Sequence, residues 1–396
     1  MQTKFQLLDS FLINHQEFWR IDPFHLCQAE QQPWALQSPE LKSWLDSLSI
    51  NDVTQYKEQP ERLINHITSF IPELESVAEN TFLPLSQSQG LDLDRNTGVG
   101  IPGRKLEQIL TMGEAALTNH RGTEWLEWCS GKGFLGRVLA QQSQQKVTSF
   151  EWQQSLCESG QQIADKQGLN MRFIQGDAFN KDSINVFNSR QHAIALHACG
   201  DLHVKLIQHA VAVGLPAISF SPCCYHLIQG DRYQALSLPA QTSALELLKA
   251  DLRIPLQETV TGGERVKRHR QIEMTFRLGF SRLLKQELGM TGYVPVPSIK
   301  KSQLDEGFEA FCQWAAAKKG LTLPSADLEA YETFGESDFW EMEKLSLVQQ
   351  VFRRPLELWL ILDKALFMEE QGYHVNIMEF CDKKVTPRNI LLHAYK

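Results

Sequence analysis

Apolar and polar segments alternate regularly through the middle of the chain. Short apolar runs with the length of buried strands occur at residues 125–128, 146–150, 171–175, 192–196 and 217–220. The segments between them are longer, and their apolar positions recur at helical spacing, as at residues 134–139 after the first run. Strands that alternate with helices predict an α/β fold with a parallel sheet, which binds its ligand beyond the carboxyl ends of the strands.

The rest of the chain has mostly helical patterning. Residues 1–95 are expected to be helical, and helical windows follow the fifth apolar run at residues 244–252, 272–287, 302–319 and 338–352. Pro355 suits the first turn of a further amphipathic helix that extends to Glu370. Two β-like runs, 374–380 and 389–395, close the sequence and are expected to be the sixth and seventh strands of the sheet.

Polar and glycine residues follow the first apolar run. Glu127 lies at the end of the run, and Gly131 and Gly133 form a turn before the next helical segment. Because glycine has no Cβ atom, it adopts turn conformations that other residues rarely adopt, and it lets a ligand approach the backbone closely. The carboxylate of Glu127 suits a ligand amine better than a pyrophosphate.

Acidic side chains follow the next two runs as well. Glu151 and Trp152 end the second run, where an acidic residue commonly holds two ribose hydroxyls. Asp177 and Ala178 follow the third run. Each residue alone has an ordinary explanation: Glu151 as a solvated charge, Asp177 as a helix N-cap and Trp152 as core packing. Their occurrence in order at consecutive strand ends favours a nucleotide-type cofactor.

Several segments resemble known methyltransferases. Residues 127–136 resemble motif I of class I S-adenosylmethionine (SAM) methyltransferases, with Cys129 in the place of the usual first glycine. The segments Leu-His-Ala-Cys-Gly-Asp-Leu at 196–202 and Ser-Pro-Cys-Cys-Tyr-His-Leu at 221–227 are similar to a narrower group. That group includes the eukaryotic tRNA acceptor-stem 2′-O-ribose methyltransferase and a methyltransferase-like domain attached to a glutathione-transferase-type domain in animals. Lys105 and the run Thr-Pro-Arg-Asn at 386–389 also match it, so the likeness covers residues 100–228 and 355–396.

The resemblance implies a Rossmann-like class I methyltransferase sheet that ends in an antiparallel hairpin. Together with the helical pattern of the remaining segments, it predicts four regions: a helical N-terminal region at 1–95, a SAM-binding core at 96–228, a helical insertion at 229–353 that could bind substrate, and the last helix and hairpin at 354–396. The residues expected to bind SAM are Glu127, Cys129, Gly131, Gly133, Glu151, Trp152, Asp177, Ala178 and His197.

The same resemblance suggests how the methyl acceptor is handled. Tyr225 and His226, with His197 across the cleft, are expected to line the acceptor pocket, and a histidine titrates in the range that a general base needs. Lys105 could orient a phosphate or a hydroxyl. The expected acceptor is RNA, either tRNA or rRNA, methylated on a hydroxyl or a nitrogen.

Three cysteines lie close in sequence to these histidines, and each could have one of several roles. Cys199, Cys223 and Cys224 could be packing residues, metal ligands or, as in cytosine C5 methyltransferases, a nucleophile. Successive side chains on extended backbone face opposite ways, so adjacent cysteines are poor ligands for one ion. Packing is therefore the favoured role, and no metal is expected.

Composition narrows the choice of partners and compartment. The net charge of −8 argues against a general polyanion-binding protein, but one basic cluster (Arg265, Lys267, Arg268, His269, Arg270) could grip RNA phosphates. The eight unevenly spaced cysteines indicate reduced thiols. Neither a signal peptide nor a membrane span is recognisable, so a cytoplasmic protein is expected.

Other functional classes remain open on the sequence. A nicotinamide-dependent oxidoreductase could use the Gly-x-Gly-x-x-Gly register of Gly131, Gly133 and Gly136. The acceptor of a methyltransferase could be a protein or a small molecule. The departure at Cys129 is also compatible with a non-catalytic module that retains the fold.

Overall fold

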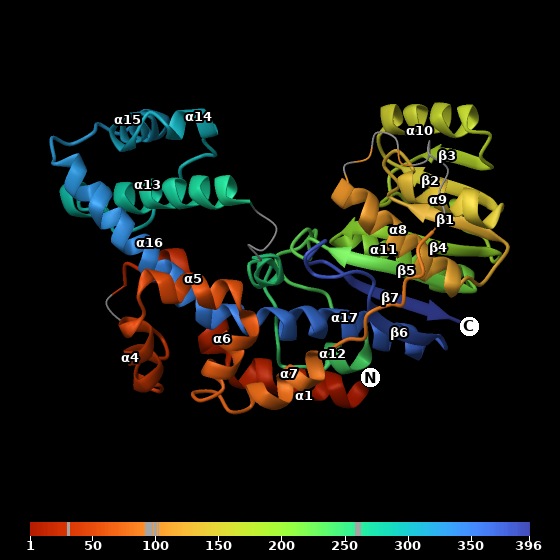
Figure 1. Ribbon diagram of the computed structural model, residues 1–396, viewed down its shortest axis with the longest axis horizontal. Coiled ribbons are helices and arrows are strands. Elements are labelled where there is room, and N and C mark those ends of the chain that lie inside the picture. Colours follow the sequence, from red (N-terminus) through yellow and green to blue (C-terminus); the bar gives the residue numbers. More distant parts are fainter. Residues whose placement is uncertain (30–31, 92–97, 99–100, 102, 258–262) are drawn as a thin grey trace. The chain divides into compact units, whose positions relative to one another are not determined.

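The computed structural model describes residues 1–396 except 30–31, 92–97, 99–100, 102 and 258–262, and it divides the chain into two compact units (Figure 1). The sheet unit comprises residues 1–13, 79–261 and 354–396. The helical unit comprises residues 14–78 and 262–353. Each unit therefore consists of segments that are distant in the sequence.

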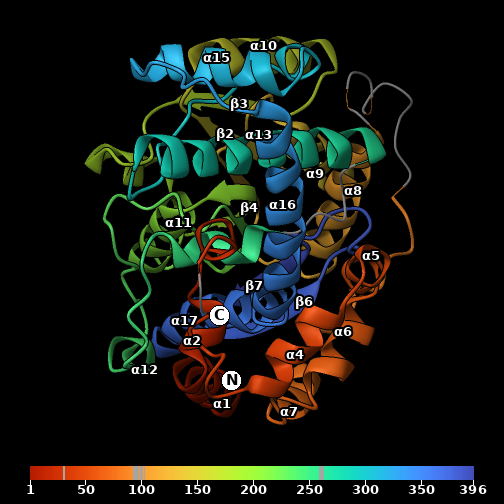
Figure 2. The same cartoon turned by 90° about the vertical axis from the view of Figure 1, so that its left-hand side faces the viewer.

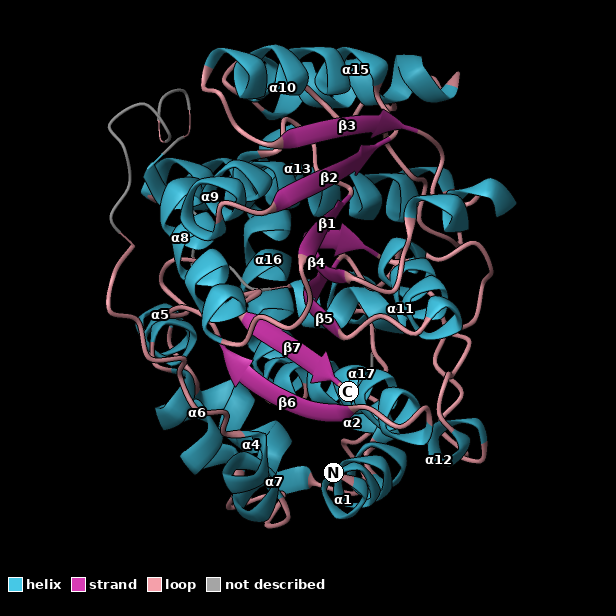
Figure 3. Cartoon of the chain, turned by 90° about the vertical axis from the view of Figure 1, so that its right-hand side faces the viewer, coloured by secondary structure: helices cyan, strands magenta, loops and turns pink. Residues whose placement is uncertain are grey.

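The sheet unit contains a seven-stranded sheet in the order β3-β2-β1-β4-β5-β7-β6 (Figure 3). Its strands are β1 Glu124–Trp128, β2 Lys146–Glu151, β3 Met171–Gln175, β4 Gln191–Cys199, β5 Ala217–Cys223, β6 His374–Glu379 and β7 Ile390–Tyr395. The first five strands pair in parallel, whereas β7 is antiparallel to both β5 and β6. The predicted sheet is confirmed, including the two closing strands. The order of the strands switches at β1 and β4: β2 and β3 follow on one side, and β5 follows on the other. In such sheets the ligand binds in the crevice at this switch point.

Helices cover both faces of this sheet. The main ones are α1 Gln2–Asn14, α8 Gly103–Thr118, α9 Phe134–Ser143, α10 Gln154–Lys166, α11 Asp201–Val213 and α17 Arg353–Glu370. Helices α8 and α9 lie on one face and α11 on the other (Figure 3). The apolar runs that predicted the strands are buried here, with Trp125, Val147 and Ile194 packed against Val138 of α9. Short elements are α12 Leu238–Gln241 and the 3₁₀ helices η1 Lys181–Val186 and η2 Asp251–Leu256.

Two long helices organise the helical unit. Helices α13 Glu264–Leu288 and α16 Leu328–Gln350 pack against each other (Figure 2). Glycines permit this close packing: a Cβ atom on Gly335 would overlap the carbonyl oxygen of Thr275, and one on Gly279 would lie 2.6 Å from that of Tyr331. The other helices are α2 Gln16–Trp19, α3 Pro23–Leu26, α4 Pro39–Ser47, α5 Ile50–Glu58, α6 Pro60–Ile67, α7 Leu74–Thr81, α14 Lys301–Leu304 and α15 Phe308–Lys319.

Two of the helical windows differ from the prediction. Residues 244–252 form turns and a β-bridge between Arg232 and Leu248, since the Asp251 carboxylate accepts the Leu248 N–H at 2.8 Å. The window at 302–319 is divided into α14 and α15, because Gly307 adopts φ +92° between them. The remaining predicted helices are present.

The unit boundaries also differ from the four expected regions. Residues 14–78 and 262–353 form one unit, whereas a separate N-terminal region and insertion were expected. The expected boundary at 95/96 lies outside the described residues. Within the described part of the chain, no helix has the length and apolar character needed to span a bilayer.

Candidate cofactor and acceptor site

A cavity of about 360 Å³ opens at the carboxyl ends of β1, β2 and β3. Strand-end residues and the start of α11 line it: Cys129, Phe150, Glu151, Trp152, Gly176, Asp177, Ala178, Phe179 and Leu202. Five of the residues predicted to bind the cofactor thus meet in one place. Its size, its largely apolar wall and its few carboxylates are typical of a small-molecule site.

The turn after β1 has the left-handed backbone that its glycines permit. Gly131 and Gly133 adopt φ values of +58° and +67°. A Cβ atom on Gly133 would overlap the Phe173 ring, whereas one on Gly131 would meet nothing within 4 Å. Gly133 is therefore required by packing, and Gly131 borders open space. Cys129 also lies in the left-handed region, at φ +56°, which explains why glycine is usual at this position.

Glu151 connects the glycine turn to the cavity. Its carboxylate accepts the backbone N–H groups of Gly131 and Gln153, both at 2.9 Å. A carboxylate has about four acceptor positions, so two remain for the hydroxyls of a ribose. Trp152 is 68% exposed at the rim of the cavity, where its ring is accessible to a ligand.

Glu127 occupies a different environment from the one expected. Its side chain is buried outside the cavity lining and accepts the Gly136 N–H at 2.9 Å and the Ser149 hydroxyl at 2.7 Å. Burial raises the pKa of this carboxyl to about 7. In this arrangement Glu127 joins α9 to β2, and its contact with a ligand amine stays a prediction.

His197 lies in an irregular part of β4, where the pairing register with β5 shifts between Leu196 and Ala198. Its φ is +65°, and its Nε2 lies 3.0 Å from the Gln108 amide oxygen. Because that oxygen only accepts, Nε2 donates and Nδ1 carries the lone pair. Burial, followed by the charges of Arg388 and Lys105, lowers the pKa of His197 to about 4. The imidazole is thus neutral at pH 7, able to take a proton but weakly basic.

Of the other two residues predicted to line the acceptor pocket, Tyr225 is buried and His226 is partly exposed. Tyr225 is 3% exposed, and its hydroxyl donates to Glu357 at 3.4 Å. The expectation that Tyr225 lines an acceptor pocket is corrected, because its ring and hydroxyl are inside the protein. His226 is partly exposed, and burial together with Arg253 and Lys249 lowers its pKa.

Positive charge surrounds both histidines. Lys105 is exposed, with its Nζ 5.5 Å from the centre of the Phe134 ring, and acts on His197 together with Arg388. The Arg388 guanidinium donates to the Leu256 carbonyl at 3.3 Å. Arg253 is exposed and acts on His226. Cations therefore lie near both histidines, although the whole chain carries a net charge of −8.

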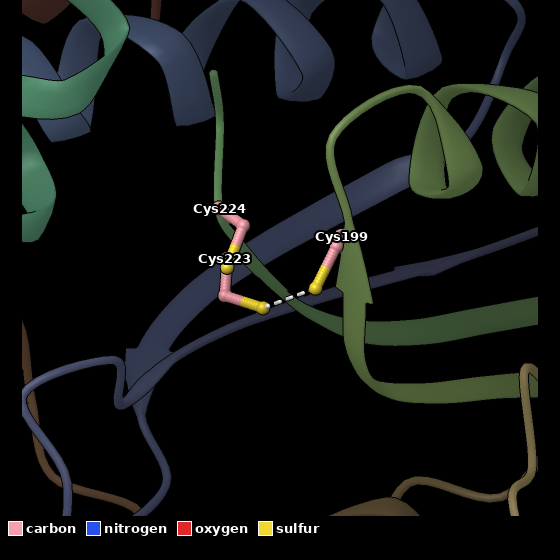
Figure 4. Close-up of side chains that lie close together, drawn as sticks. All are labelled: Cys199, Cys223 and Cys224. Carbon is pink, nitrogen blue, oxygen red and sulfur yellow. Dashed lines mark hydrogen bonds between the residues drawn. The ribbon is translucent and has the colours of Figure 1, made fainter. Parts of the chain in front are cut away.

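The three cysteines converge at the ends of β4 and β5 (Figure 4). Cys199 and Cys223 are register partners with a 3.3 Å separation between sulfurs, and all three sulfurs lie within 4.8 Å of one another. The expectation that adjacent cysteines diverge is wrong here, because Cys224 leaves the extended conformation with φ +47°. The hydrogen bond from Cys223 is the main cause that lowers the pKa of Cys199 to about 6, and Cys224 and Arg388 add to it. Burial opposes this change.

Sequence reasoning missed several residues of the site. Phe150 and Phe179 line the cavity without a recognisable motif, and Leu202 lines it from the end of the matching segment at 196–202. Gln108 lies one helical turn after Lys105, and that spacing could have indicated a shared face of α8. Arg388 was noted only as part of a matching segment, since nothing local indicates that it lies near His197.

Comparison with known proteins shows one family match and several similar solved structures. Residues 104–231 match the family described as a methyltransferase domain. Similar solved structures include the Pyrococcus abyssi tRNA (uracil-54, C5)-methyltransferase with S-adenosyl-L-homocysteine, at 18% identity, TM-score 0.26, and coverage of 29% of this chain and 28% of that one. TrmN from Thermus thermophilus matches at 16% identity and TM-score 0.28, covering 35% and 46% of the two chains. A SAM-dependent methyltransferase from Aquifex aeolicus matches at 16% identity and TM-score 0.25, covering 33% and 72%. The match therefore spans less than half of the first two proteins.

The cavity fits SAM, the cofactor that the sequence resemblance implies. Glu151 has acceptor positions left for ribose hydroxyls, and the space beside Gly131 is open. When bound, SAM supplies a methyl group on a sulfonium leaving group, and the protein must orient the acceptor and exclude water. The sheet order also differs from the dinucleotide-binding order 3-2-1-4-5-6, since β7 is inserted between β5 and β6. Residues 104–231 are therefore similar in sequence to a methyltransferase-domain family, and they include the first five strands of the sheet.

Proposed function

We propose that the enzyme methylates RNA, either a tRNA or an rRNA, on a ribose hydroxyl or a base nitrogen. The observation that carries the proposal is a group of cations near the two histidines. Besides burial, the charges of Arg388 and Lys105 lower the pKa of His197, and those of Arg253 and Lys249 lower the pKa of His226. Cations concentrated beside an acceptor site in an acidic chain favour a polyanionic acceptor. The resemblance to a tRNA ribose methyltransferase supports the same acceptor.

Each of these side chains has a distinct role in the proposal. The Nδ1 atom of His197 takes the proton of the acceptor, while Gln108 fixes the orientation of its ring. Lys105 and Arg388 hold a phosphate next to the reacting nucleotide. Glu151 binds the cofactor ribose at the neighbouring strand ends.

The basic cluster of α13 contributes less than its composition suggests. Arg270 pairs with the buried Glu343 at 2.8 Å, and Lys267 pairs with Glu58 at 3.3 Å and Glu264 at 3.0 Å. Arg265 and Arg268 are exposed on the first turns of α13. We therefore assign phosphate contacts in the helical unit to Arg265 and Arg268, with smaller contributions from Lys267 and Arg270.

The test measures transfer of a labelled methyl group from SAM to total tRNA and rRNA, together with RNA binding at several salt concentrations. The double variant Lys105→Ala, Arg253→Ala should lower RNA affinity and reduce the slope of log affinity against log salt by about 0.7 to 0.9 for each lost contact. SAM affinity should not change, because neither residue lines the cavity.

Lys166→Ala is the matched control. This exposed lysine ends α10, the helix that leads away from the carboxyl edge of β2, so its loss should leave the slope unchanged. Two results would contradict an RNA acceptor: the wild-type protein does not bind RNA at low salt, or the double variant has the same salt slope as the wild type. Either result would favour a protein or small-molecule acceptor.

A further inference from the structure

We infer that Cys199, Cys223 and Cys224 form a binding site for one Zn²⁺ ion, with solvent in the fourth coordination position. The first support for this site is the spacing of the three sulfur atoms. Thiolates on a tetrahedral zinc lie roughly 3.8 Å apart, which follows from a Zn–S bond of about 2.3 Å. The Cys199 and Cys223 sulfurs are 3.3 Å apart, and no pair among the three exceeds 4.8 Å. The sulfurs are therefore already near the spacing that a zinc ion requires.

The backbone that carries the sulfurs is held by contacts around the two strand ends. Gly200 donates its N–H to the Cys223 carbonyl at 3.1 Å, and Asp201 donates to the Leu227 carbonyl, also at 3.1 Å. A Cβ atom on Gly200 would overlap that same Leu227 carbonyl, so the two loops touch closely. The loop after β5 is thereby held against β4, and the turn at Cys224 brings its sulfur back toward the other two (Figure 4).

The ligand chemistry and the local charge favour a soft divalent ion. Thiolates select zinc over magnesium or calcium, and three protein ligands leave one position for an exchangeable fourth ligand. Three thiolates with Zn²⁺ carry a net charge of −1. The positive charge of Arg388, which acts on both Cys199 and Cys224, compensates it.

The same geometry has a competing chemical outcome. Cys199 and Cys223 face each other across neighbouring strands and could be oxidised to a disulfide by an external oxidant. A disulfide would use only two of the three thiols and would leave Cys224 without the role that its unusual backbone gives it. The experiment therefore has to count all three thiols. The proposal is independent of the methyl acceptor, because it concerns only these side chains.

Zinc content and thiol protection test the site directly on the full-length protein. The protein is purified with a non-thiol reductant, incubated with ZnSO₄, freed of unbound ion and analysed for metal. We expect one zinc per chain. Brief alkylation with iodoacetamide, mapped by peptide mass spectrometry, should show that zinc protects Cys199, Cys223 and Cys224 together while the reactivity of Cys157 does not change.

Variants separate this site from other thiols of the chain. Cys224→Ser, at a partly exposed position, should weaken zinc binding at least about tenfold. Cys312→Ala, in the core of the helical unit, is the control and should retain full zinc content. Circular dichroism confirms that both variants fold.

Three results would overturn the proposal. The first is wild-type protein without zinc, and the second is a Cys224→Ser variant that retains it with unchanged affinity. The third is a Cys199–Cys223 disulfide that persists in the reductant. If a cysteine variant fails to fold, the protection pattern of the wild-type protein decides the question alone.

Discussion

Left-handed backbone is concentrated at the strand ends that form the candidate site. Four described non-glycine residues have a positive φ, and three of them lie at the ends of β1, β4 and β5: Cys129, His197 and Cys224. The fourth, Gln144, caps the C-terminus of α9. Left-handed conformations cost about 1–2 kcal/mol for residues with a Cβ atom and persist where the surroundings impose them. Their positions indicate that the strand ends are shaped for ligands at some cost in stability.

The strain at Cys129 leads to a first prediction. Cys129→Gly should raise the free energy of unfolding by about 1 kcal/mol, because glycine adopts φ +56° without steric penalty, and SAM should still bind. Thermal denaturation and calorimetry measure the two quantities. Gln144→Gly is the matched control, since it relieves a similar φ of +57° away from the cavity. Loss of SAM binding in Cys129→Gly alone would show that the thiol itself contacts the cofactor.

The two glycines of the turn should respond differently to substitution. Gly131→Val places its side chain in open space beside the cavity, so SAM binding should be lost while the fold persists, at a cost of about 1–2 kcal/mol from the left-handed φ. Gly133→Val should lower the melting temperature much more, because the new side chain overlaps Phe173. Unchanged SAM affinity in a folded Gly131→Val protein would contradict the site.

At the scale of elements, the sequence correctly predicted the strands whose bounds are determined by local residue patterns. Strand β3 has the predicted bounds, and the ends of β1 and β2 differ by about one residue, because apolar runs bounded by polar residues define them. The hypothesis of diverging cysteines failed for a non-local reason: the φ of Cys224 depends on how the loop after β5 packs against Gly200. Such packing leaves no periodic signal in the sequence.

A chain of histidines links three strands and gives a pH-dependent prediction. His192 of β4 contacts Ser219 of β5 at 2.9 Å, and Ser219 contacts His393 of β7 at 2.8 Å. Burial lowers the pKa of His393 to about 4 and that of His192 well below its usual range. Between pH 6.5 and 4 the unfolded chain binds protons that the folded protein does not, so stability falls as pH drops through this window. His393 alone should contribute on the order of 3 kcal/mol to that fall.

Denaturant unfolding at several pH values measures this effect. His393→Gln should make stability less dependent on pH between 6.5 and 4, although it lowers stability at pH 7 because the contact with Ser219 is disturbed. The exposed His374 provides the control, and His374→Gln should leave the pH dependence intact. A pH dependence that is identical in wild type and His393→Gln would show that folding does not lower the pKa of this histidine.

At the scale of the whole molecule, each unit is completed by segments far apart in the chain. In the helical unit, Lys57 of α5 pairs with Glu343 of α16, and Gln349 donates to the carbonyl of Trp19 at 2.8 Å. Each segment taken alone has an ordinary amphipathic pattern, and no local pattern indicates that residues 14–78 and 262–353 form one unit. The sheet was predictable across a similar separation, because the closing hairpin has its own β-like pattern.

That hairpin carries the last prediction. Strand β7 pairs with β5 and buries Ile390, Leu391 and Leu392 in the sheet unit. Deletion of residues 372–396 would leave β5 as an apolar strand at the edge of the sheet, and such edges aggregate. We expect the truncated protein to be insoluble. Leu391→Asp should reproduce this, because it buries an unpaired charge at a position that is 0% exposed. His374→Asp, on the exposed end of β6, should remain soluble and bind SAM. A soluble truncated protein with wild-type SAM affinity would mean that the hairpin is dispensable and that the five parallel strands alone form the cofactor site.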